Sequence, residues 1–176
     1  MIDLTPAVRE LAALLDRVPD DRLAAPTPCA GFDVAALIDH VDEAARGFTA
    51  MAGREPAATG GADRRKAAAE HLRDLAEAWA DPAAWRGDGD AGGGLVLPNE
   101  TWGLVALTEA VVHGWDLATA LGEPFDLPGE TLRACFAHVA AFVPNAPLPE
   151  LWGPAVEVPE DAPLIDRIVA VTGRTP

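Results

Sequence analysis

Apolar residues recur every three or four positions in several long segments of this 176-residue chain, and prolines and glycines separate the segments. Such a period places apolar side chains on one face of an α-helix. The spacing is mostly helical rather than alternating, and alanine and leucine, two good helix formers, dominate the composition. The sequence therefore predicts an all-α protein.

The expected helices follow from this period and from the residues that interrupt it. Five helices are predicted over about 5–18, 33–52, 63–80, 99–121 and 128–143, and a short last helix over about 162–172. Thr5, Asp33 and Asn99 are placed as N-terminal caps, and Gly122 as the residue that ends the fourth helix. Residues 81–100 contain a glycine cluster, so we expect a flexible loop with one short extended segment there.

The chain is predicted to form a single domain over residues 1–176. Four main helices joined by moderate loops indicate an antiparallel four-helix bundle, with a short extra C-terminal helix and an extended, proline-rich tail. A chain of this length buries roughly 70% of its unfolded surface, so it needs neither disulfides nor a metal to fold. Cys29 and Cys135 show no paired spacing, which favours a reducing compartment.

A formal net charge of −15 limits the partners of this chain. Such a surface repels phosphate backbones, and no basic stripe is present, so nucleic acid is not expected as a partner. Anionic membranes are disfavoured for the same reason. The charged N-terminal segment reads as neither a signal peptide nor an anchor, and no uncharged run approaches the ~18 residues of a membrane span. We expect a cytoplasmic protein that acts on a small molecule and that could form a homodimer.

Three ionisable residues share one stripe of the apolar segment TEAVVHGWDLA at residues 108–118. Glu109, His113 and Asp116 have i, i+4, i+7 spacing, which places them on the same face of the predicted helix. Burying such groups without partners is costly, and a divalent ion is one suitable partner. His40, flanked on its own helix by small residues, completes a His/Glu/His set of the kind that zinc enzymes use with an open coordination position.

Each of these residues also has a structural interpretation. The three could form a buried hydrogen-bonded cluster without a metal, and His40 alone could be a core histidine bonded to a backbone carbonyl. Cys29 could be a fourth ligand or a reactive thiol, but a small buried residue that fixes its loop is the favoured interpretation. His71 and Asp74 repeat the His-x-x-Asp spacing among charged neighbours, and they are assigned to a solvated helix face.

The segments PTPCAGFDVAALIDH and, about seventy residues later, EAVVHGWDLA resemble the DinB-like superfamily. The similarity is greatest to the actinobacterial branch related to mycothiol-dependent maleylpyruvate isomerase, and it extends over nearly the whole chain. The resemblance implies a four-helix bundle with a divalent metal, commonly zinc or nickel, held by His40, Glu109 and His113. It gives Asp116 the nearby acidic position, with a catalytic role in orienting a ligand or a metal-bound water.

Two functional classes follow from these expectations. The first is a metal- and thiol-dependent transferase or isomerase, in which the resemblance suggests mycothiol as the co-substrate and zinc as the main metal, with nickel second. The second is a non-catalytic metal-binding or stress-response module. A shared bundle does not transfer a reaction, so the sequence leaves the choice between them open.

Overall fold

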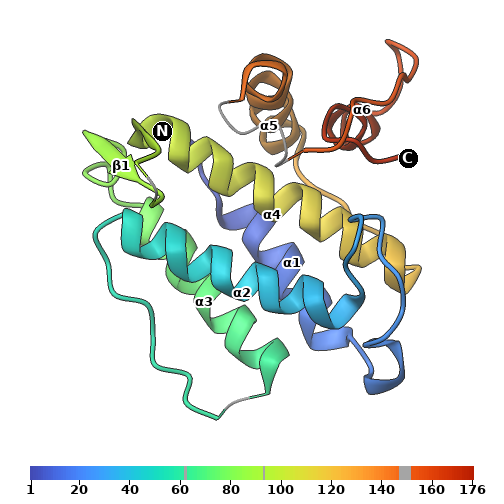
Figure 1. The fold of residues 1–176 in the computed structure, drawn as a ribbon, viewed down its shortest axis with the longest axis horizontal. Helices are drawn as coiled ribbons and strands as arrows, with labels where there is room; N and C mark the ends of the chain where they lie inside the picture. Colours follow the sequence, from blue (N-terminus) through green and yellow to red (C-terminus); the bar gives the residue numbers. More distant parts are fainter. Residues whose placement is uncertain (62, 93, 147–151) are drawn as a thin grey trace.

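The computed structural model describes residues 1–61, 63–92, 94–146 and 152–176. This part of the chain is mostly helical, with six α-helices and one small antiparallel sheet (Figure 1). The α-helices are α1 (Thr5–Arg17), α2 (Val34–Met51), α3 (Arg64–Trp79), α4 (Asn99–Leu121), α5 (Gly129–Phe142) and α6 (Leu164–Val171). Two short 3-10 helices, η1 (Asp20–Arg22) and η2 (Val143–Asn145), and two strands, β1 (Asp88–Asp90) and β2 (Val96–Pro98), complete the described elements.

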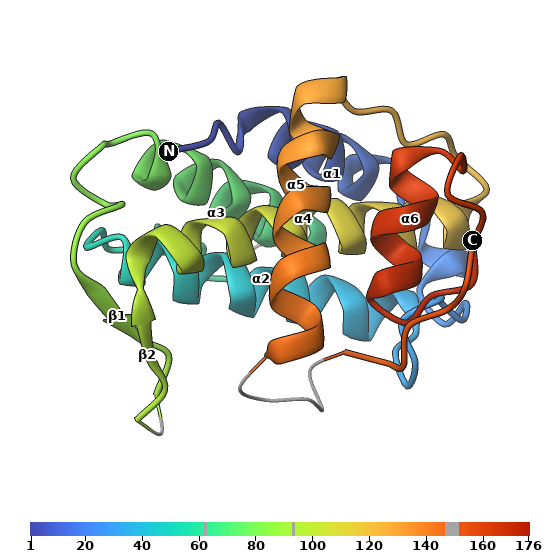
Figure 2. The ribbon, with the colours of Figure 1, turned by 90° about the horizontal axis from the view of Figure 1, so that it is seen from above.

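Helix α4 is at the centre of the packing. Helices α1 and α2 each contact both α3 and α4, so the first four helices form a ring. Helices α5 and α6 lie side by side against α4, and they are seen almost end-on in Figure 1 and lengthwise across α4 in Figure 2. The mostly helical class is therefore confirmed, while the crossing of α4 by α5 and α6 adds a layer that the sequence pattern did not predict.

The apolar stripes read from the sequence form the core. Val8, Leu11 and Leu15 of α1 and Leu37 and Ile38 of α2 are each at most 1% exposed. Helix α4 is enclosed on several sides, and it is the one helix of the described ranges long and apolar enough to cross a membrane. Because 72% of its most apolar window is buried inside the fold, its apolar character is that of a core helix.

Two of the predicted helix ends form as expected. The Asp33 side chain caps α2 by accepting a hydrogen bond from the backbone N–H of Ala36 at 2.8 Å. Gly122 ends α4 with φ of 72°, a left-handed conformation that favours glycine. These two residues set where α2 and α4 begin and end along the chain, and so they help to set the register of the side chains between the two helices.

Two other predicted caps are wrong. Thr5 is the first residue of α1, and its own N–H donates to Asp3 Oδ1 at 2.9 Å. Asn99 is likewise the first residue of α4 and makes no cap hydrogen bond. Its amide Nδ2 instead donates to the carbonyls of Ala84 and Arg86, at 2.9 and 3.0 Å, which ties the start of α4 to the preceding loop.

Residues 81–100 contain a β-hairpin rather than a loop with one extended segment. Strands β1 and β2 pair antiparallel with Gly89 opposite Leu97. The sequence DGD of β1 lacks the β-branched and aromatic residues typical of strands, so only β2 carried a local signal. The indole Nε1 of Trp102 donates to the Gly89 carbonyl at 2.8 Å, and this tertiary contact holds the hairpin against α4.

His71 does not lie on a solvated helix face. Its side chain is only 3% exposed, with Nδ1 at 2.6 Å from Asp42 Oδ1 and Nε2 at 2.9 Å from the Ala57 carbonyl oxygen. Asp74 accepts a hydrogen bond from the backbone N–H of Ala57 instead of contacting His71. The two residues together hold the segment between α2 and α3, and this role is structural.

Candidate functional site

Two helices bring the three predicted ligand residues to one point. His40 lies on α2, and Glu109 and His113 lie one turn apart on α4. His40 Nε2 is 3.2 Å from Glu109 Oε2 and 3.1 Å from His113 Nε2, and the last two atoms are 3.1 Å apart. The imidazole rings of the two histidines meet almost at right angles, with centroids 4.8 Å apart. The structure therefore gathers the three side chains that the sequence analysis singled out.

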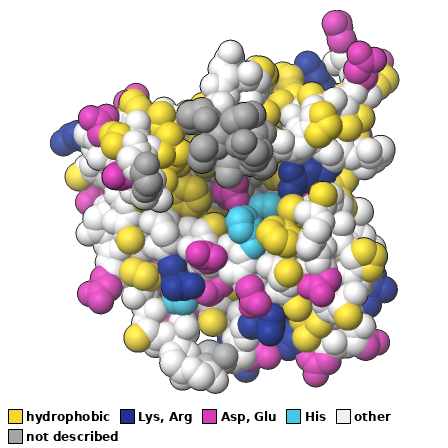
Figure 3. Space-filling view, viewed as in Figure 1, with side chains coloured by type: hydrophobic (Ala, Val, Ile, Leu, Met, Phe, Trp, Pro, Cys, Tyr) yellow, Lys and Arg dark blue, Asp and Glu magenta, His cyan; other side chains and the backbone are white. Residues whose placement is uncertain are grey.

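The cluster forms part of the wall of a cavity of about 430 Å³. The side chain of His40 is 35% exposed and that of Glu109 20%, whereas that of His113 is only 6% exposed. Near the middle of the face in Figure 3, a histidine side chain lies beside an acidic one, with hydrophobic and basic side chains next to them. Its volume lies in the range of small-molecule sites, and its other walls include Phe32, Trp152 and Arg174.

Asp116 stands behind His113 rather than in the cavity. Its side chain is fully buried, and its Oδ2 atom lies 3.0 Å from His113 Nδ1. A hydrogen bond donated by Nδ1 leaves the lone pair of His113 on Nε2, the nitrogen that faces His40 and Glu109. The contacts of Asp116 are thus those of a group that orients an imidazole ligand, and its predicted catalytic role stays a prediction.

Arg174 holds Asp116 from the other side. Its Nε and a terminal nitrogen donate to the two carboxylate oxygens of Asp116, at 3.2 and 2.9 Å, and its second terminal nitrogen donates to the Thr172 carbonyl. Such a two-point pair fixes both the position and the orientation of the carboxylate. Residues 113, 116 and 174 therefore form a continuous polar chain, in which the buried Asp116 links two residues that line the cavity.

A close backbone approach places Arg174 at this point. Gly173, just after α6, has φ of 87°, and a Cβ atom on it would lie 2.5 Å from the Cα of Gly153. Only a glycine fits there, since the segment around residue 153 passes directly over it. The backbone N–H of Arg174 also donates to the Val169 carbonyl at 2.9 Å. The C-terminal segment is thus one wall of the site.

The charges of the cluster depend strongly on one another. Burial works to lower the pKa of His113, but the carboxylates of Glu109 and Asp116 outweigh burial and raise that pKa to about 9. Burial likewise works to raise the pKa of Glu109, whereas the charge of His113 and hydrogen bonds from both histidines hold it well below its usual range. A positive charge is therefore favoured between these groups, either as a proton or as a cation.

The three donor atoms have a spacing that could hold a divalent cation. Atoms spaced 3.1–3.2 Å apart can all lie about 2.0–2.1 Å from an ion placed roughly 1 Å out of their plane, the usual bond lengths for zinc. Two imidazole nitrogens and one carboxylate oxygen are ligands that zinc and nickel both accept. The cavity side of the cluster leaves room for a further ligand. The donor set and its geometry fit a metal ion with an open position.

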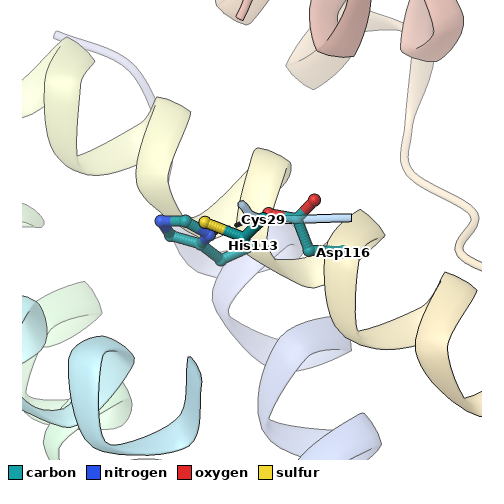
Figure 4. Close-up of side chains that lie close together, drawn as sticks. All are labelled: Cys29, His113 and Asp116. Carbon is teal, nitrogen blue, oxygen red and sulfur yellow. Dashed lines mark hydrogen bonds and ion pairs between the residues drawn. The ribbon is translucent and has the colours of Figure 1, made fainter. Parts of the chain in front are cut away.

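Cys29 lies beside this cluster, but its sulfur is not one of the three atoms in mutual contact. Its sulfur is within 4.8 Å of donor atoms of His113 and Asp116. Figure 4 shows these three side chains close together. The backbone carbonyl of Cys29 accepts a hydrogen bond from Phe32 N–H at 3.1 Å, which closes the turn that carries the thiol. Burial raises the pKa of the Cys29 thiol, and Arg174 offsets only part of that effect. A thiolate activated by a helix N-terminus is not what this environment favours.

Sequence reasoning missed Arg174, the residue that completes the site. It is 58 positions away from Asp116, and the segment VTGRTP contains no motif that indicates such a contact. The signal available was indirect, because a fully buried Asp116 requires a cationic partner and the chain has only 13 Lys and Arg residues in total.

The fold is mostly helical, and two histidines and one glutamate from two helices meet at the wall of a cavity. The chain belongs to the family described as the mycothiol maleylpyruvate isomerase N-terminal domain, whose family model matches residues 4–118. The matched range includes the His40, Glu109 and His113 cluster and Asp116, and it ends before α5, α6 and Arg174.

Two curated relatives are uncharacterized proteins of Mycobacterium tuberculosis, one from strain CDC 1551 and one from strain H37Rv. Each is 31% identical to this chain, in an alignment that covers 93% of this chain and 91% of the relative. No solved structure gives a significant match.

Proposed function

We propose that this chain is a DinB-like domain that binds one divalent metal ion through His40, Glu109 and His113. In this proposal the ring of α1, α2, α3 and α4 is the antiparallel four-helix bundle, and α5 and α6 are additions that cover α4. The family membership supports a mycothiol-related domain of this kind. The observation that carries the proposal is the 3.1–3.2 Å spacing of the three donor atoms, which come from two different helices.

The proposed metal is zinc, with nickel as the second choice. Zinc suits two imidazoles and one carboxylate, and it commonly keeps a fourth position for water or substrate in catalytic sites. The polar chain through Asp116 and Arg174 would fix the His113 ring and keep its Nε2 lone pair directed at the ion. Zinc, nickel and a proton compete for the same place, because the metal-free cluster favours a protonated His113.

We further propose a thiol co-substrate, mycothiol by resemblance, in a transfer or isomerisation reaction. A divalent ion supplies Lewis-acid chemistry at such a site by lowering the pKa of a thiol or water that it coordinates. The chain itself would contribute the cavity, which is large enough for a small molecule, and the walls around Phe32 and Trp152, which would exclude water from part of the ligand. A cytoplasmic location with neither nucleic acid nor membrane as a partner, as expected from the charge, completes this proposal.

Metal content tests the proposal first. Protein purified without an affinity tag is expected to contain about one divalent ion per chain by elemental analysis, and His40→Ala and His113→Ala each to lose it. The Ala80→Leu variant, on an exposed residue at the end of α3, is the matched control and should keep its metal. Undiminished metal in both histidine variants would remove the ligand assignment. With metal fully loaded, absence of both thiol binding and thiol-dependent turnover would remove the enzymatic part.

A non-catalytic metal-binding or stress-response module is the alternative, and one observation favours it. Apart from the proposed ligands, Cys29 and Arg174 are the only ionisable side chains among the described residues that line the cavity. The pKa of Cys29 is raised and Arg174 is engaged by Asp116, so neither is suited to act as a general base. Thiol binding without turnover would support this alternative.

A further inference from the structure

A second hollow lies further along the same side of α2. It is a groove of about 510 Å³ between the second half of α2, the β1 end of the hairpin and the start of α4. Its walls include the side chains of Phe48, Met51 and Trp102, and Asp90 is the only charged residue among the described residues that line it. Grooves of this size with apolar walls are typical of small-molecule sites.

The aromatic walls of this groove are held in place before any ligand binds. The Trp102 indole Nε1 donates to the Gly89 carbonyl at 2.8 Å, and the Phe48 and Trp102 ring centroids are 6.3 Å apart. The Phe48 backbone carbonyl also accepts a hydrogen bond from Trp79 Nε1 at 3.0 Å. The groove is therefore preformed, so a ligand would lose little free energy in ordering its walls.

An unused hydrogen-bond acceptor is buried next to this groove. Asn99 is 8% exposed, and its Oδ1 atom has no hydrogen-bond partner among the described residues. Oδ1, Met51 Cγ and Trp102 Cδ1 all converge on Gly89, since a Cβ atom there would lie 2.7, 2.8 and 2.9 Å from them. Buried acceptors normally have a donor.

The groove and the His40 cluster lie close together along α2. Ala44 and Phe48 line the groove and also a small void inside the ring of helices, and Glu109 and His113 line both that void and the cavity of the cluster. On α2, residues 40, 44, 48 and 51 share one face. Eleven residues of helix separate His40 from Met51, which corresponds to a length of about 16 Å.

We propose that the groove receives the apolar body, an aliphatic chain or a ring, of an elongated substrate whose donor head binds at the His40, Glu109 and His113 cluster. Ala44 and Gly47, which line the groove, have small side chains, and Ala44 lies one helical turn from His40 on α2. This inference rests on the proposed function for the head of the ligand. It adds the class of substrate, a molecule of about 10–16 Å with a long uncharged apolar part.

Binding of a homologous series of straight-chain alkanethiols to the metal-loaded protein tests the inference. Affinity should rise about fourfold for each added methylene, the gain expected when a methylene leaves water, until the groove is filled. Gly47→Leu should abolish this dependence on chain length and leave the affinity for the shortest thiol unchanged. Gly47 is helical and a Cβ atom on it meets nothing within 4 Å, so the leucine fits without strain. Gly60→Leu, at another exposed and open glycine, is the matched control.

Affinity independent of chain length in the wild type, or an unaltered dependence in Gly47→Leu, would overturn the inference. The same series of alkanols, measured on the metal-free protein, separates this result from the proposed function. Chain-length dependence that Gly47→Leu removes there, in a protein that never retains metal, supports the groove and sinks the metal site. One ion per chain, together with tight binding of short thiols and no chain-length dependence, supports the metal site and overturns the groove.

Discussion

Two buried histidines of this chain share the His-x-x-Asp spacing but differ in what their Nε2 atoms contact. His71 and His113 both stand three residues before an aspartate, on α3 and α4. Each has its Nδ1 within hydrogen-bond distance of a carboxylate, Asp42 for His71 and Asp116 for His113. The Nε2 of His71 faces the Ala57 carbonyl, whereas the Nε2 of His113 faces a second imidazole and a carboxylate at the wall of a cavity.

The partner of the second nitrogen therefore separates a structural histidine from a candidate ligand. A backbone carbonyl accepts one hydrogen bond and leaves no lone pair of the imidazole available to an ion. A neighbouring imidazole and carboxylate supply further lone pairs at the same point, which only a proton or a cation can satisfy. Burial and the His-x-x-Asp spacing are common to both, so neither identifies a metal site.

Alanine at each histidine should give opposite results, and this is the largest expected contrast. His113→Ala is expected to lower metal affinity by at least about a thousandfold, because one of three protein ligands is lost. His71→Ala is expected to keep the metal and to lower the free energy of unfolding by about 3 kcal/mol, since Asp42 and the Ala57 carbonyl lose their shared partner. Metal titration and chemical denaturation of both variants measure the two effects. Loss of metal from His71→Ala would end the distinction.

Removing the charge behind His113 should weaken metal binding without abolishing it. Asp116→Asn keeps the shape of the side chain but no longer stabilises the ligating tautomer, so metal affinity is expected to fall by about 10–100-fold. The variant should also leave the guanidinium of Arg174 buried without its counter-charge. Competition with a chelator gives the affinity, and Asp74→Asn, which alters the aspartate after His71, is the matched control. Equal affinity of the two variants would show that Asp116 does not act on the metal ligand.

The metal-free protein should lose stability as the pH rises. The pKa of His113 is about 9 in the folded chain and 6.5 in the unfolded chain. The contribution of His113 to the free energy of unfolding is therefore fully present below about pH 6.5 and is lost as the pH rises through 9. The lowered pKa of Glu109 has the opposite sign, and its contribution is lost as the pH falls below about 4.5. Denaturation of the metal-free protein should therefore show a free energy of unfolding that falls by roughly 2–3 kcal/mol between about pH 6.5 and pH 9. A constant stability over that range would contradict a protonated His113 in the metal-free cluster.

The smallest effect is expected at Cys29. Cys29→Ser should change metal affinity by less than about threefold, because the thiol lies near His113 but outside the three contacting donors. A loss as large as that of His40→Ala would make Cys29 a fourth ligand and would redefine the cluster. Metal titration of the two variants side by side measures the difference.

Local patterns in the sequence predicted much of this fold. The apolar period and the punctuation at Asp33 and Gly122 placed α2 and α4, the helices that carry the cluster, because caps and helix faces depend on residues a few positions apart. The contact between His40 and the Glu109–His113 pair spans about seventy residues, and its prediction depended on chemistry and resemblance rather than on periodicity.

Three of the missed features depend on contacts that local sequence patterns do not encode. Strand β1 is held by its pairing with β2 and by Trp102 rather than by its own composition. His71 is buried by the segment between α2 and α3, and Arg174 reaches Asp116 only because Gly173 and Gly153 pass close to each other. A single sequence contains no local signal for any of these three contacts.

Anomalous diffraction at the absorption edge of the bound metal is the most direct test of the central claim, that two helices hold one divalent ion. The account predicts a single peak about 2 Å from His40 Nε2, His113 Nε2 and a Glu109 carboxylate oxygen, and no peak at His71. A peak elsewhere would contradict it. So would crystals of untreated protein that show no peak and have the three side chains in direct hydrogen-bond contact.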